Sequence, residues 1–180
     1  MKLRYFIILF TFISCLGHKN ANDGVASILP SAVSDLQSQS KVTLILPKGD
    51  KLYTYMALTV EEQTQGLSGL KDHQFSDNEA MIFMYPKNRY HSFWMPDTYF
   101  NLDIFFLDKE LKIVDVERNV LHHPGRSTPP PIPTTRAIYA QHVLEVKSKS
   151  SLAKSLNIGD RLQWVAPPEY DFVLKNLKDF

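Results

Sequence analysis

Cysteine is nearly absent from this sequence of 180 residues, which contains only Cys15. Because Cys15 lies close to the N-terminus, the rest of the chain can form neither an internal disulfide nor a cysteine-ligated metal site. Stability must therefore come from a hydrophobic core. A chain of this length, with 44% apolar residues, can build one domain with such a core and additional tails.

The sequence also lacks a strong net charge. It has 20 basic and 19 acidic residues, and the formal net charge is +1 with histidine neutral. There is no basic stripe, so we expect no nucleic-acid partner. The six histidines show no H-x-x-x-H spacing, and we expect them in solvated loops, with no metal or other cofactor. No G-x-S-x-G motif marks a nucleophilic serine.

No hydrophobic run is long enough for a mature membrane-spanning helix, which needs about 20 residues. The apolar run 5–13 follows two basic residues, which predicts a signal peptide over residues 1–14. The stretch FISC, residues 12–15, resembles a bacterial lipobox, although Phe12 stands where leucine is more usual. We therefore expect cleavage before Cys15 and attachment of lipid to its thiol.

The predicted organisation after the signal peptide has three parts. Residues 15–40 are rich in Ser, Asn, Asp and Gly and are expected to form a flexible, lipid-anchored tether. Residues 41–165 are expected to form a β-rich domain, and residues 166–180 a C-terminal tail. The protein would be exported to the bacterial cell envelope and held on the membrane by its lipid, on the periplasmic side in a Gram-negative cell.

Short apolar segments separated by turn residues begin at Lys41. KVTLIL with KLYTYMALT, and YFNLDIFFLD with LKIVDVE, predict two hairpins. AMIFMY, YHSFWM, AIYAQHVLEVK and RLQWVA are further predicted strands. This pattern favours a mainly β fold, an antiparallel sandwich or a partly closed barrel.

Two short helices are expected within this β-rich domain. Thr59 and Glu62 match a capping box at the start of the first helix, and Gly66 is suited to end it. The second helix lies within SSLAKSLNIGD, capped by one of its first serines and ending near its asparagine or glycine. Between the last hairpin and the last strands, residues 121–135 are rich in proline, which lacks amide donors, and predict a long surface loop.

Three of these segments resemble blocks of the bacterial and archaeal family known as domain of unknown function 192. EEQTQGLSGL is similar to a helix ending in Arg-Gly-Leu-Met, AMIFMY to a Gly-Met-Leu-Phe strand, and FWMPDTYFNLDIFFLD to a Phe-Trp-Met-x-Asn-Thr block. HVLEVKSKSSLAKSLNIGDRL resembles the closing strand, helix and turn. The resemblance implies a mainly β, sandwich-like domain that is often exported, and no established activity.

The sequence departs from that family pattern at four positions. Gln65 stands where the family usually has arginine, Ser68 where it has methionine, Asp97 where it has asparagine, and Asn101 where it has proline. If the arginine serves a ligand in relatives, this protein must bind its ligand differently or not bind it.

The candidate site combines the end of the first helix with the tryptophan-containing turn and the strand after it. The ligand-binding candidates are Gln65, Gly66, Leu67, Trp94, Met95, Asp97, Thr98 and Asp103. An aromatic wall with polar groups is typical of a pocket.

A structural interpretation of the same residues stands beside the pocket. Trp94 is expected in the core, and Asp97 can accept amide hydrogens within its own turn. Asp103 lies in an apolar strand and must be paired, either with a basic residue across the strands or with the helix N-terminus near Thr59.

Three functions remain open at this point. The first is an accessory binding domain for a small polar ligand or a sugar, which could stack on Tyr53, Tyr55, Tyr90, Trp94 or Tyr99. The second is an envelope hydrolase that uses Asp97 and Asp103 as an acid–base pair. The third is a structural interaction module that uses the proline-rich loop 121–135.

Overall fold

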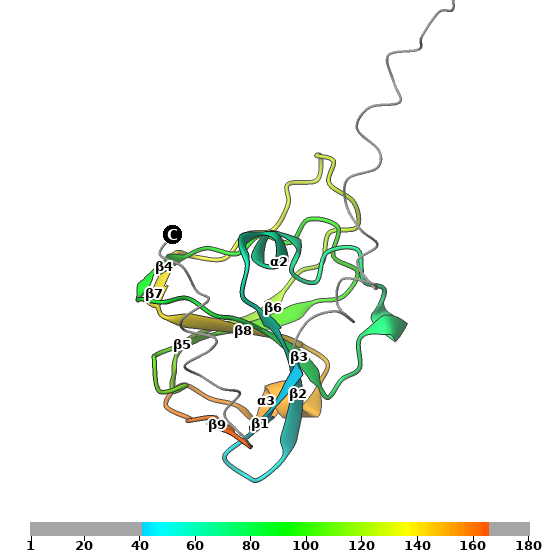
Figure 1. Cartoon of the computed structure of the whole chain (residues 1–180). Coiled ribbons are helices and arrows are strands. Elements are labelled where there is room, and N and C mark those ends of the chain that lie inside the picture. Colours follow the sequence, from blue (N-terminus) through cyan, green and yellow to red (C-terminus); the bar gives the residue numbers. More distant parts are fainter. Residues whose placement is uncertain (1–40, 166–180) are drawn as a thin grey trace, which may run out of the picture.

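The computed structural model describes residues 41–165, which form a curled sheet, a small second sheet and short helices (Figure 1). The predicted signal peptide 1–14, the lipidation site Cys15, the tether 15–40 and the tail 166–180 lie outside the described residues. In the described part, no helix is long and apolar enough to cross a membrane.

The main sheet has seven strands in the order β6-β5-β8-β3-β2-β1-β9. These strands are β1 (Lys41–Ile45), β2 (Lys51–Ala57), β3 (Glu79–Phe83), β5 (Leu102–Leu107), β6 (Ile113–Val120), β8 (His142–Lys147) and β9 (Gln163–Trp164). A second sheet pairs β4 (Arg89–His91) with β7 (Ile138–Ala140). The mainly β fold class predicted from the sequence is confirmed.

Both predicted hairpins are present, since β1 pairs with β2 and β5 with β6 in antiparallel fashion. The expectation of a purely antiparallel sheet is wrong at one place, because β2 and β3 run parallel. Parallel neighbours need a long crossover connection. The chain supplies it between these strands with α2 (Val60–Gln65) and the 3₁₀ turn η1 (Asp72–Gln74).

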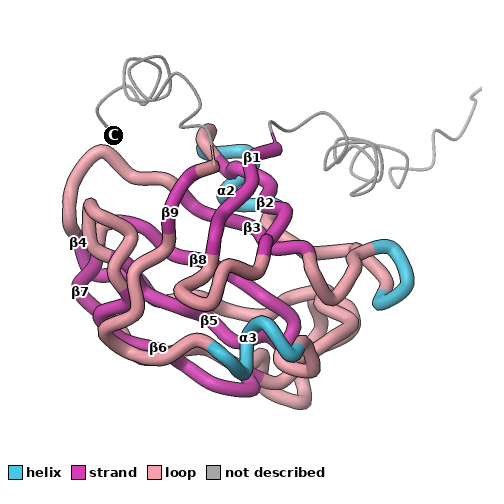
Figure 2. The backbone as a smooth tube through the Cα atoms, turned by 90° about the horizontal axis from the view of Figure 1, so that it is seen from below, coloured by secondary structure: helices cyan, strands magenta, loops and turns pink. Residues whose placement is uncertain are grey.

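The sheet curls until its two ends approach each other (Figure 2). The amide of Gly159 donates to the carbonyl of Ile113 over 2.8 Å, and the amide of Ile113 donates to Asp160 over 2.8 Å. Leu162 and Leu111 form a third bond of 3.0 Å. The segment leading into β9 is thereby joined to the start of β6, and the result is the partly closed barrel expected from the sequence.

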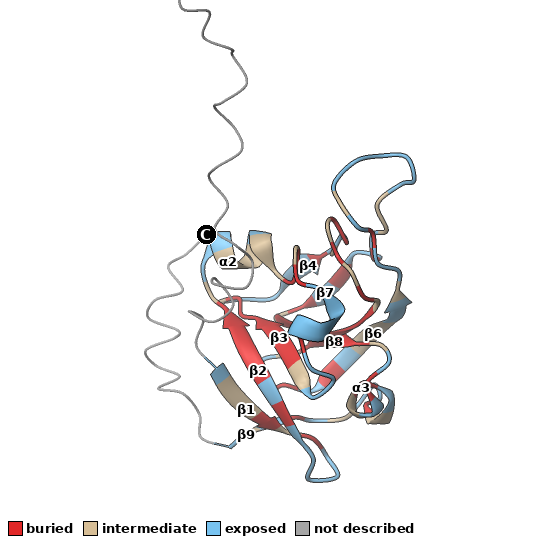
Figure 3. Ribbon diagram, turned by 90° about the vertical axis from the view of Figure 1, so that its right-hand side faces the viewer, coloured by how far each residue is buried: buried red, intermediate tan, exposed pale blue. Residues whose placement is uncertain are grey.

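Apolar side chains cover both faces of the central strands, and Figure 3 shows β2 and β3 as largely buried. On β5, Phe105 and Leu107 point into one core cluster, while Ile104 and Phe106 point into the other. This alternation follows from the two-residue period of a strand. A polar side chain in the middle of these strands consequently has mostly apolar neighbours.

The two predicted helices are present and lie towards opposite ends of the sheet in Figure 1. Thr59 and Glu62 form the predicted capping box of α2, and Gly66 ends the helix with φ of +49°. The second helix, α3 (Ser151–Ser155), is capped by Ser150 and ends earlier than its glycine suggested.

The predicted strand YHSFWM is wrong beyond its first residues. Only β4 at its beginning is a strand. Residues 93–96 form an extended connection with isolated bridges to the proline-rich loop, and Asp97 is in a turn.

Candidate functional site

A small cavity lies between the end of α2 and segment 93–98, with β8 beneath it. Its volume is about 40 Å³. A single water needs about 10–15 Å³ of such space, so the cavity has room for about three heavy atoms. Its walls are residues 63–68, 93–96 and 98 together with Phe83, Leu102 and Glu145. We call it the Glu145 cavity.

Glu145 is the only ionisable residue among the described residues that line this cavity. Its neighbours in register are Met81 on β3 and Ile104 on β5, so Glu145 lies between apolar residues of the adjacent strands. Glu145 is 5% exposed, and none of residues 41–165 forms a hydrogen bond or ion pair with its side chain. A buried polar group without a partner is costly, so such an arrangement is typical of a site rather than of a core.

Burial raises the pKa of Glu145 to about 8, because desolvation penalises the carboxylate. At neutral pH the side chain is therefore mostly a neutral carboxylic acid, which can donate one hydrogen bond and accept others. Removing its proton creates a negative charge with no positive charge among the described lining residues. The protonation state of Glu145 therefore depends strongly on the charge of any group that enters the cavity.

The end of α2 is shaped into a tight turn above this carboxyl group. The Gly66 amide donates to the carbonyl of Glu62 over 2.8 Å, and Gln65 Nε2 donates to the carbonyl of Ser68 over 2.7 Å. Gly66 has φ of +49° and ψ of −134°, a conformation that residues with a side chain rarely adopt. A Cβ atom at this position would also lie 3.3 Å from Cζ of Phe83. The turn is thus packed directly on a wall of the cavity.

Segment 93–98 is held in place by both ends of the proline-rich loop. The Thr135 amide donates to the carbonyl of Phe93 over 2.7 Å, and the Met95 amide donates to Pro133 over 3.0 Å. At the other end, the Thr98 amide donates to the carbonyl of His123 over 3.1 Å. The rest of the loop projects from the domain as an exposed segment (Figure 3). Loop 121–135 therefore fixes the position of segment 93–98, which forms one wall of the cavity.

Two further bonds join segment 93–98 to the turn after α2. Ser68 Oγ donates to the carbonyl of Pro96 over 2.8 Å, and the Gly69 amide donates to Asp97 over 2.8 Å. The cavity walls are consequently one hydrogen-bonded unit rather than two independent loops.

The expectation that Trp94 is a core residue is wrong. Its side chain is 56% exposed, whereas Met95 beside it is 1% exposed. The segment is extended at this point, since residue 94 bridges Thr134, and successive side chains therefore point to opposite sides. Phe93 and Met95 take the inward positions, and Trp94 lies at the rim of the Glu145 cavity.

Six of the eight ligand candidates named from the sequence line this one cavity. They are Gln65, Gly66, Leu67, Trp94, Met95 and Thr98. Asp97 and Asp103 are not among the lining residues. The structure thus brings most of the candidate residues together, and ligand binding by them stays a prediction.

Asp97 has a local structural role. Its Oδ1 atom accepts hydrogen bonds from the Tyr99 hydroxyl over 2.8 Å and from the Gly125 amide over 3.2 Å. Asp97 has φ of +53°, a left-handed conformation that aspartate tolerates better than most residues. The side chain fastens the proline-rich loop to the turn, in keeping with the structural interpretation of this residue.

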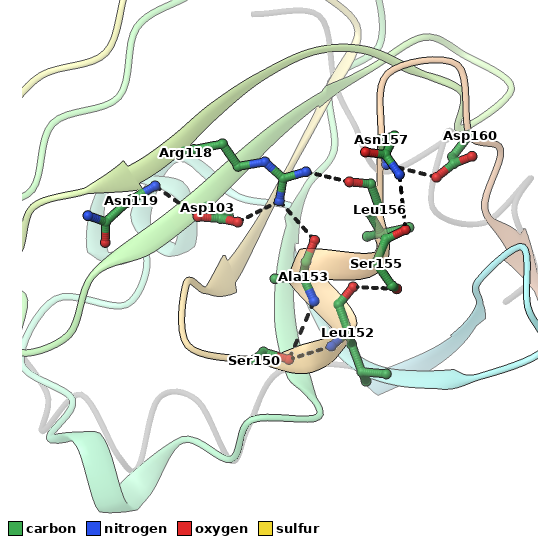
Figure 4. A network of polar contacts seen from close by, with 10 residues as sticks. All are labelled: Asp103, Arg118, Asn119, Ser150, Leu152, Ala153, Ser155, Leu156, Asn157 and Asp160. Atoms are coloured by element: carbon green, nitrogen blue, oxygen red, sulfur yellow. Dashed lines mark hydrogen bonds and ion pairs between the residues drawn. The ribbon is translucent and has the colours of Figure 1, made fainter.

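Asp103 is paired across the strands, as one of the two sequence alternatives predicted. Its Oδ2 atom lies 2.6 Å from Arg118 Nη1, and its Oδ1 atom accepts from the Asn119 amide over 2.8 Å (Figure 4). Arg118 also donates to the carbonyls of Ala153 and Leu156 at the end of α3. Asp103 thus anchors an arginine that satisfies the free carbonyls of a helix C-terminus. The N-terminus near Thr59 is not involved in these contacts.

Sequence reasoning missed Glu145, which is the centre of the cavity. The signal was the segment HVLEVK, in which a single acidic residue interrupts an apolar strand. Asp103 also interrupts an apolar strand, and the sequence does not show which of the two acidic residues has a partner. That difference depends on Arg118, which lies on the neighbouring strand.

A second and larger cavity, of about 400 Å³, lies at the C-terminal end of β8. Its lining includes Lys147, which is 2% exposed, and Lys149. Lys147 Nζ is 3.0 Å from Asp72 Oδ1, and Lys149 Nζ is 2.7 Å from Asp72 Oδ2. Hydrogen bonds from Lys149 and Lys147 lower the pKa of Asp72. Lys147 and Lys149 in this cavity are therefore paired with Asp72, whereas Glu145 has no charged partner among the described residues.

The expectation that the histidines lie in solvated loops is wrong for His91, His123 and His142, all of which are buried. Burial lowers the pKa of His91 and of His142 to about 4, and both are neutral at pH 7. Within residues 41–165, no cluster of three or more His, Cys, Asp or Glu side chains could hold a metal ion.

Fold and cavity together define a class: a small, mainly β domain with a curled sheet and a buried acid beneath a helix end. The model of the family DUF192 (Uncharacterized ACR) matches residues 44–164, and the chain belongs to this family. A comparison with curated proteins finds no significant match.

Two solved structures share the fold. One is a "putative transcription regulator" from Sinorhizobium meliloti 1021, with 25% identity and a TM-score of 0.56, covering 71% of this chain and 95% of the other. The second is a protein of unknown function from Novosphingobium aromaticivorans DSM 12444, with 27% identity and a TM-score of 0.54. It covers 70% of this chain and 85% of the other. These likenesses agree with the fold described above.

Proposed function

We propose that this domain is a binding module whose Glu145 cavity takes a small polar group. The observation that carries the proposal is the buried carboxyl group of Glu145, which lines a cavity and has no partner among the described residues. A bound ligand would satisfy it. The hydrogen-bonded walls support this role, because a cavity that is already formed loses little conformational freedom on binding.

The hydrolase alternative receives less support from the contacts. Its two carboxylates, Asp97 and Asp103, are engaged by Gly125 and Tyr99 in one case and by Arg118 in the other. A general acid or base needs access to the substrate's proton. Neither carboxylate lines the Glu145 cavity.

Binding is tested with two-dimensional NMR spectra of the purified protein in the presence of ethanol, acetamide, acetate or ethylammonium. At least one of these compounds should shift the amide signals of residues 65–68, 93–95 and 98 while signals of β9 stay in place. The variant Glu145→Gln should alter the response, and Glu110→Gln, a solvent-exposed control, should not. A protein whose cavity signals respond to none of the four compounds would not be a binding module of this kind.

A sugar is the second candidate ligand, and the size of the larger cavity favours it. About 400 Å³ lies within the range of ligand pockets, and Asn101, Asn119 and His122 supply polar groups to its lining. The ring of Tyr99 is covered by Lys71, whose Nζ lies 3.0 Å from the ring centroid, so stacking on that face is blocked. Titration with monosaccharides, read from the side-chain amide signals of Asn101 and Asn119, tests this candidate.

We also propose that the protein is exported and anchored in the cell envelope through a lipid on Cys15. The support is the sequence pattern of residues 1–15, and these residues lie outside the structural description. The variant Cys15→Ser should move the protein from the membrane fraction to the soluble fraction, because each buried methylene of a lipid chain contributes about 0.8 kcal/mol to anchoring. Unchanged partition, together with no lipid mass on the wild type, would contradict the proposal.

A further inference from the structure

We propose that the group bound in the Glu145 cavity is a small organic cation, a primary ammonium group, and that it binds the Glu145 carboxylate by displacing a proton into solvent. The proposal rests on the binding function described above and adds the chemical class of the ligand. The exchange is balanced. The carboxylic acid loses its proton to water, and the ammonium group, which keeps its own protons, takes up the negative charge that remains.

The charges of the lining residues indicate which sign of charge the ligand carries. Glu145 is the only ionisable group there, and no lysine, arginine or histidine is among the described lining residues. An anion would meet either a neutral acid or a like charge. A cation instead gains a charge-assisted hydrogen bond in a desolvated setting, where such bonds are strong.

The aromatic walls suit a cation as well. Phe83 and Phe93 pack edge to face with centroids 4.9 Å apart, and Trp94 lies at the rim. The faces of aromatic rings attract ammonium groups through the ring quadrupole. A volume of about 40 Å³ accepts an ammonium head and one or two methylene groups, but not a bulky quaternary ion.

Position 65 supports the same inference. Gln65 lines the cavity and brings no charge to it, and its amide nitrogen is bonded to the carbonyl of Ser68. The cavity therefore contains the acid without an internal cation to match it. An external ammonium group would supply that charge.

Titration of the site is governed by Glu145 itself. Among the other ionisable groups on the packed elements, Glu62 lies in the capping box of α2, Asp97 is bonded to Tyr99 and Gly125, Asp103 of β5 is paired with Arg118, and Lys147 of β8 is paired with Asp72. Glu61 of α2 is exposed. Burial lowers the pKa of His142 on β8 and of His91, which contacts Phe93, to about 4, so both stay neutral between pH 6 and pH 9. Burial raises the pKa of Tyr85, which follows β3, whereas Arg89 over its ring acts in the opposite sense and Glu145 raises the pKa further. Tyr85 consequently stays neutral over the range in which Glu145 titrates.

The coupling between ammonium binding and proton release predicts how the affinity depends on pH. Because the pKa of free Glu145 is about 8, an ammonium ligand must displace a proton below that pH and meets the carboxylate above it. Its affinity should therefore rise on the order of 100-fold between pH 6 and pH 9. A neutral ligand should show no such rise.

The experiment is an NMR titration of the protein with ethylammonium chloride and, as a neutral isostere, ethanol, at pH 6 and pH 9 and constant ionic strength. Ethylammonium should bind far more tightly at pH 9, and the variant Glu145→Gln should lose this binding while retaining any response to ethanol. A parallel titration with Nα-acetyl-lysine methylamide distinguishes a protein side chain from a free amine as the source of the ammonium group. Calorimetry in buffers of different ionisation enthalpy should detect proton release at pH 6.

The outcomes separate the two proposals. If ethanol perturbs the cavity signals and ethylammonium does not, or if ethylammonium binds equally at both pH values, the ligand class is wrong and the binding function stands. If neither compound nor the other small probes perturb these signals, both proposals fail. The pH dependence is measured on the wild type, so the conclusion does not depend on how well the Gln variant folds.

Discussion

Arg118 Nη1 lies 2.6 Å from Oδ2 of Asp103, and the same guanidinium group donates to the carbonyls of Ala153 and Leu156 at the end of α3. One buried carboxylate on β5 thus positions the arginine that ties a helix to the sheet. Asp103 contributes to the framework of the domain rather than to the cavity wall.

This relationship predicts a loss of stability in Asp103→Asn. The amide keeps the shape of the side chain but leaves the charge of Arg118 uncompensated. Breaking a fully buried pair costs about 3–5 kcal/mol, and since Arg118 is partly exposed we expect about 1–3 kcal/mol. Denaturant unfolding measures this loss. Asp115→Asn, in an exposed pair with Arg136, should change stability by less than about 1 kcal/mol. Equal effects in the two variants would argue against the framework role.

Trp94→Ala should cost less than about 1 kcal/mol, because more than half of the side chain is already exposed. Met95→Ala, one residue away, should cost about 2–5 kcal/mol, since Met95 is buried. Thermal or denaturant unfolding of both variants tests this contrast. A Trp94→Ala variant as unstable as Met95→Ala would show that Trp94 is a core residue and contradict its position at the rim.

Gly66→Ala should destabilise the domain by about 1–3 kcal/mol, because the backbone conformation disfavours a side chain and the new Cβ would press on Phe83. Gly49→Ala is a useful comparison. Gly49 also has a positive φ, of +90°, but nothing lies within 4 Å of its added Cβ. The difference between the two unfolding free energies therefore reports the contact at the cavity wall together with the different backbone conformation of Gly66. A smaller loss at Gly66 than at Gly49 would contradict this packing.

Gln65→Arg should place a positive charge in the Glu145 cavity and lower the pKa of Glu145 from about 8, since an adjacent cation stabilises the carboxylate. The same variant should no longer bind ethylammonium. Carbon-detected NMR titration of the glutamate carboxyl signals follows the pKa. Gln163→Arg, on the exposed β9, controls for the added charge. A Glu145 signal that still titrates near pH 8 in Gln65→Arg would show that residue 65 does not face the acid.

Much of the fold could be predicted because it depends on local patterns. The capping box of Thr59 and Glu62, the glycine after α2 and the turns of both hairpins are encoded within a few neighbouring residues. The parallel pairing of β2 with β3 could not be predicted in this way. It is decided by where the chain returns after a long crossover, which no short window contains.

The candidate site was predictable in location but not in its central group. Residues 65–67 and 93–98 stood out by composition, and all of them except Asp97 line one cavity. Glu145 and Asp103 look alike in sequence, each an acid in an apolar strand. Only the fold shows that Arg118 reaches Asp103, while Met81 and Ile104 flank Glu145.

The buried acid should leave a signature in the pH dependence of stability. The pKa of Glu145 is about 8 in the folded protein and near its ordinary value of 4.5 when unfolded, so the folded state binds more protons between these values. The contribution of Glu145 to stability should therefore fall as the pH rises from 4.5 to 8, by at most about 1.4 kcal/mol per pH unit. The buried His91 and His142, with pKa values of about 4, act in the opposite sense, because around and below pH 6.5 the unfolded state binds more protons at these residues. Between pH 4 and pH 6.5 the two histidines together outweigh Glu145.

The most direct test is the free energy of unfolding measured from pH 6.5 to pH 8 in the wild type and in Glu145→Gln, because the two histidines contribute equally to both proteins and the difference between the proteins isolates Glu145. Relative to the variant, the wild type should lose about 1.6 kcal/mol of stability across this range. Equal slopes in the wild type and in Glu145→Gln would contradict the claim that an unpaired, buried carboxyl group forms the centre of the cavity.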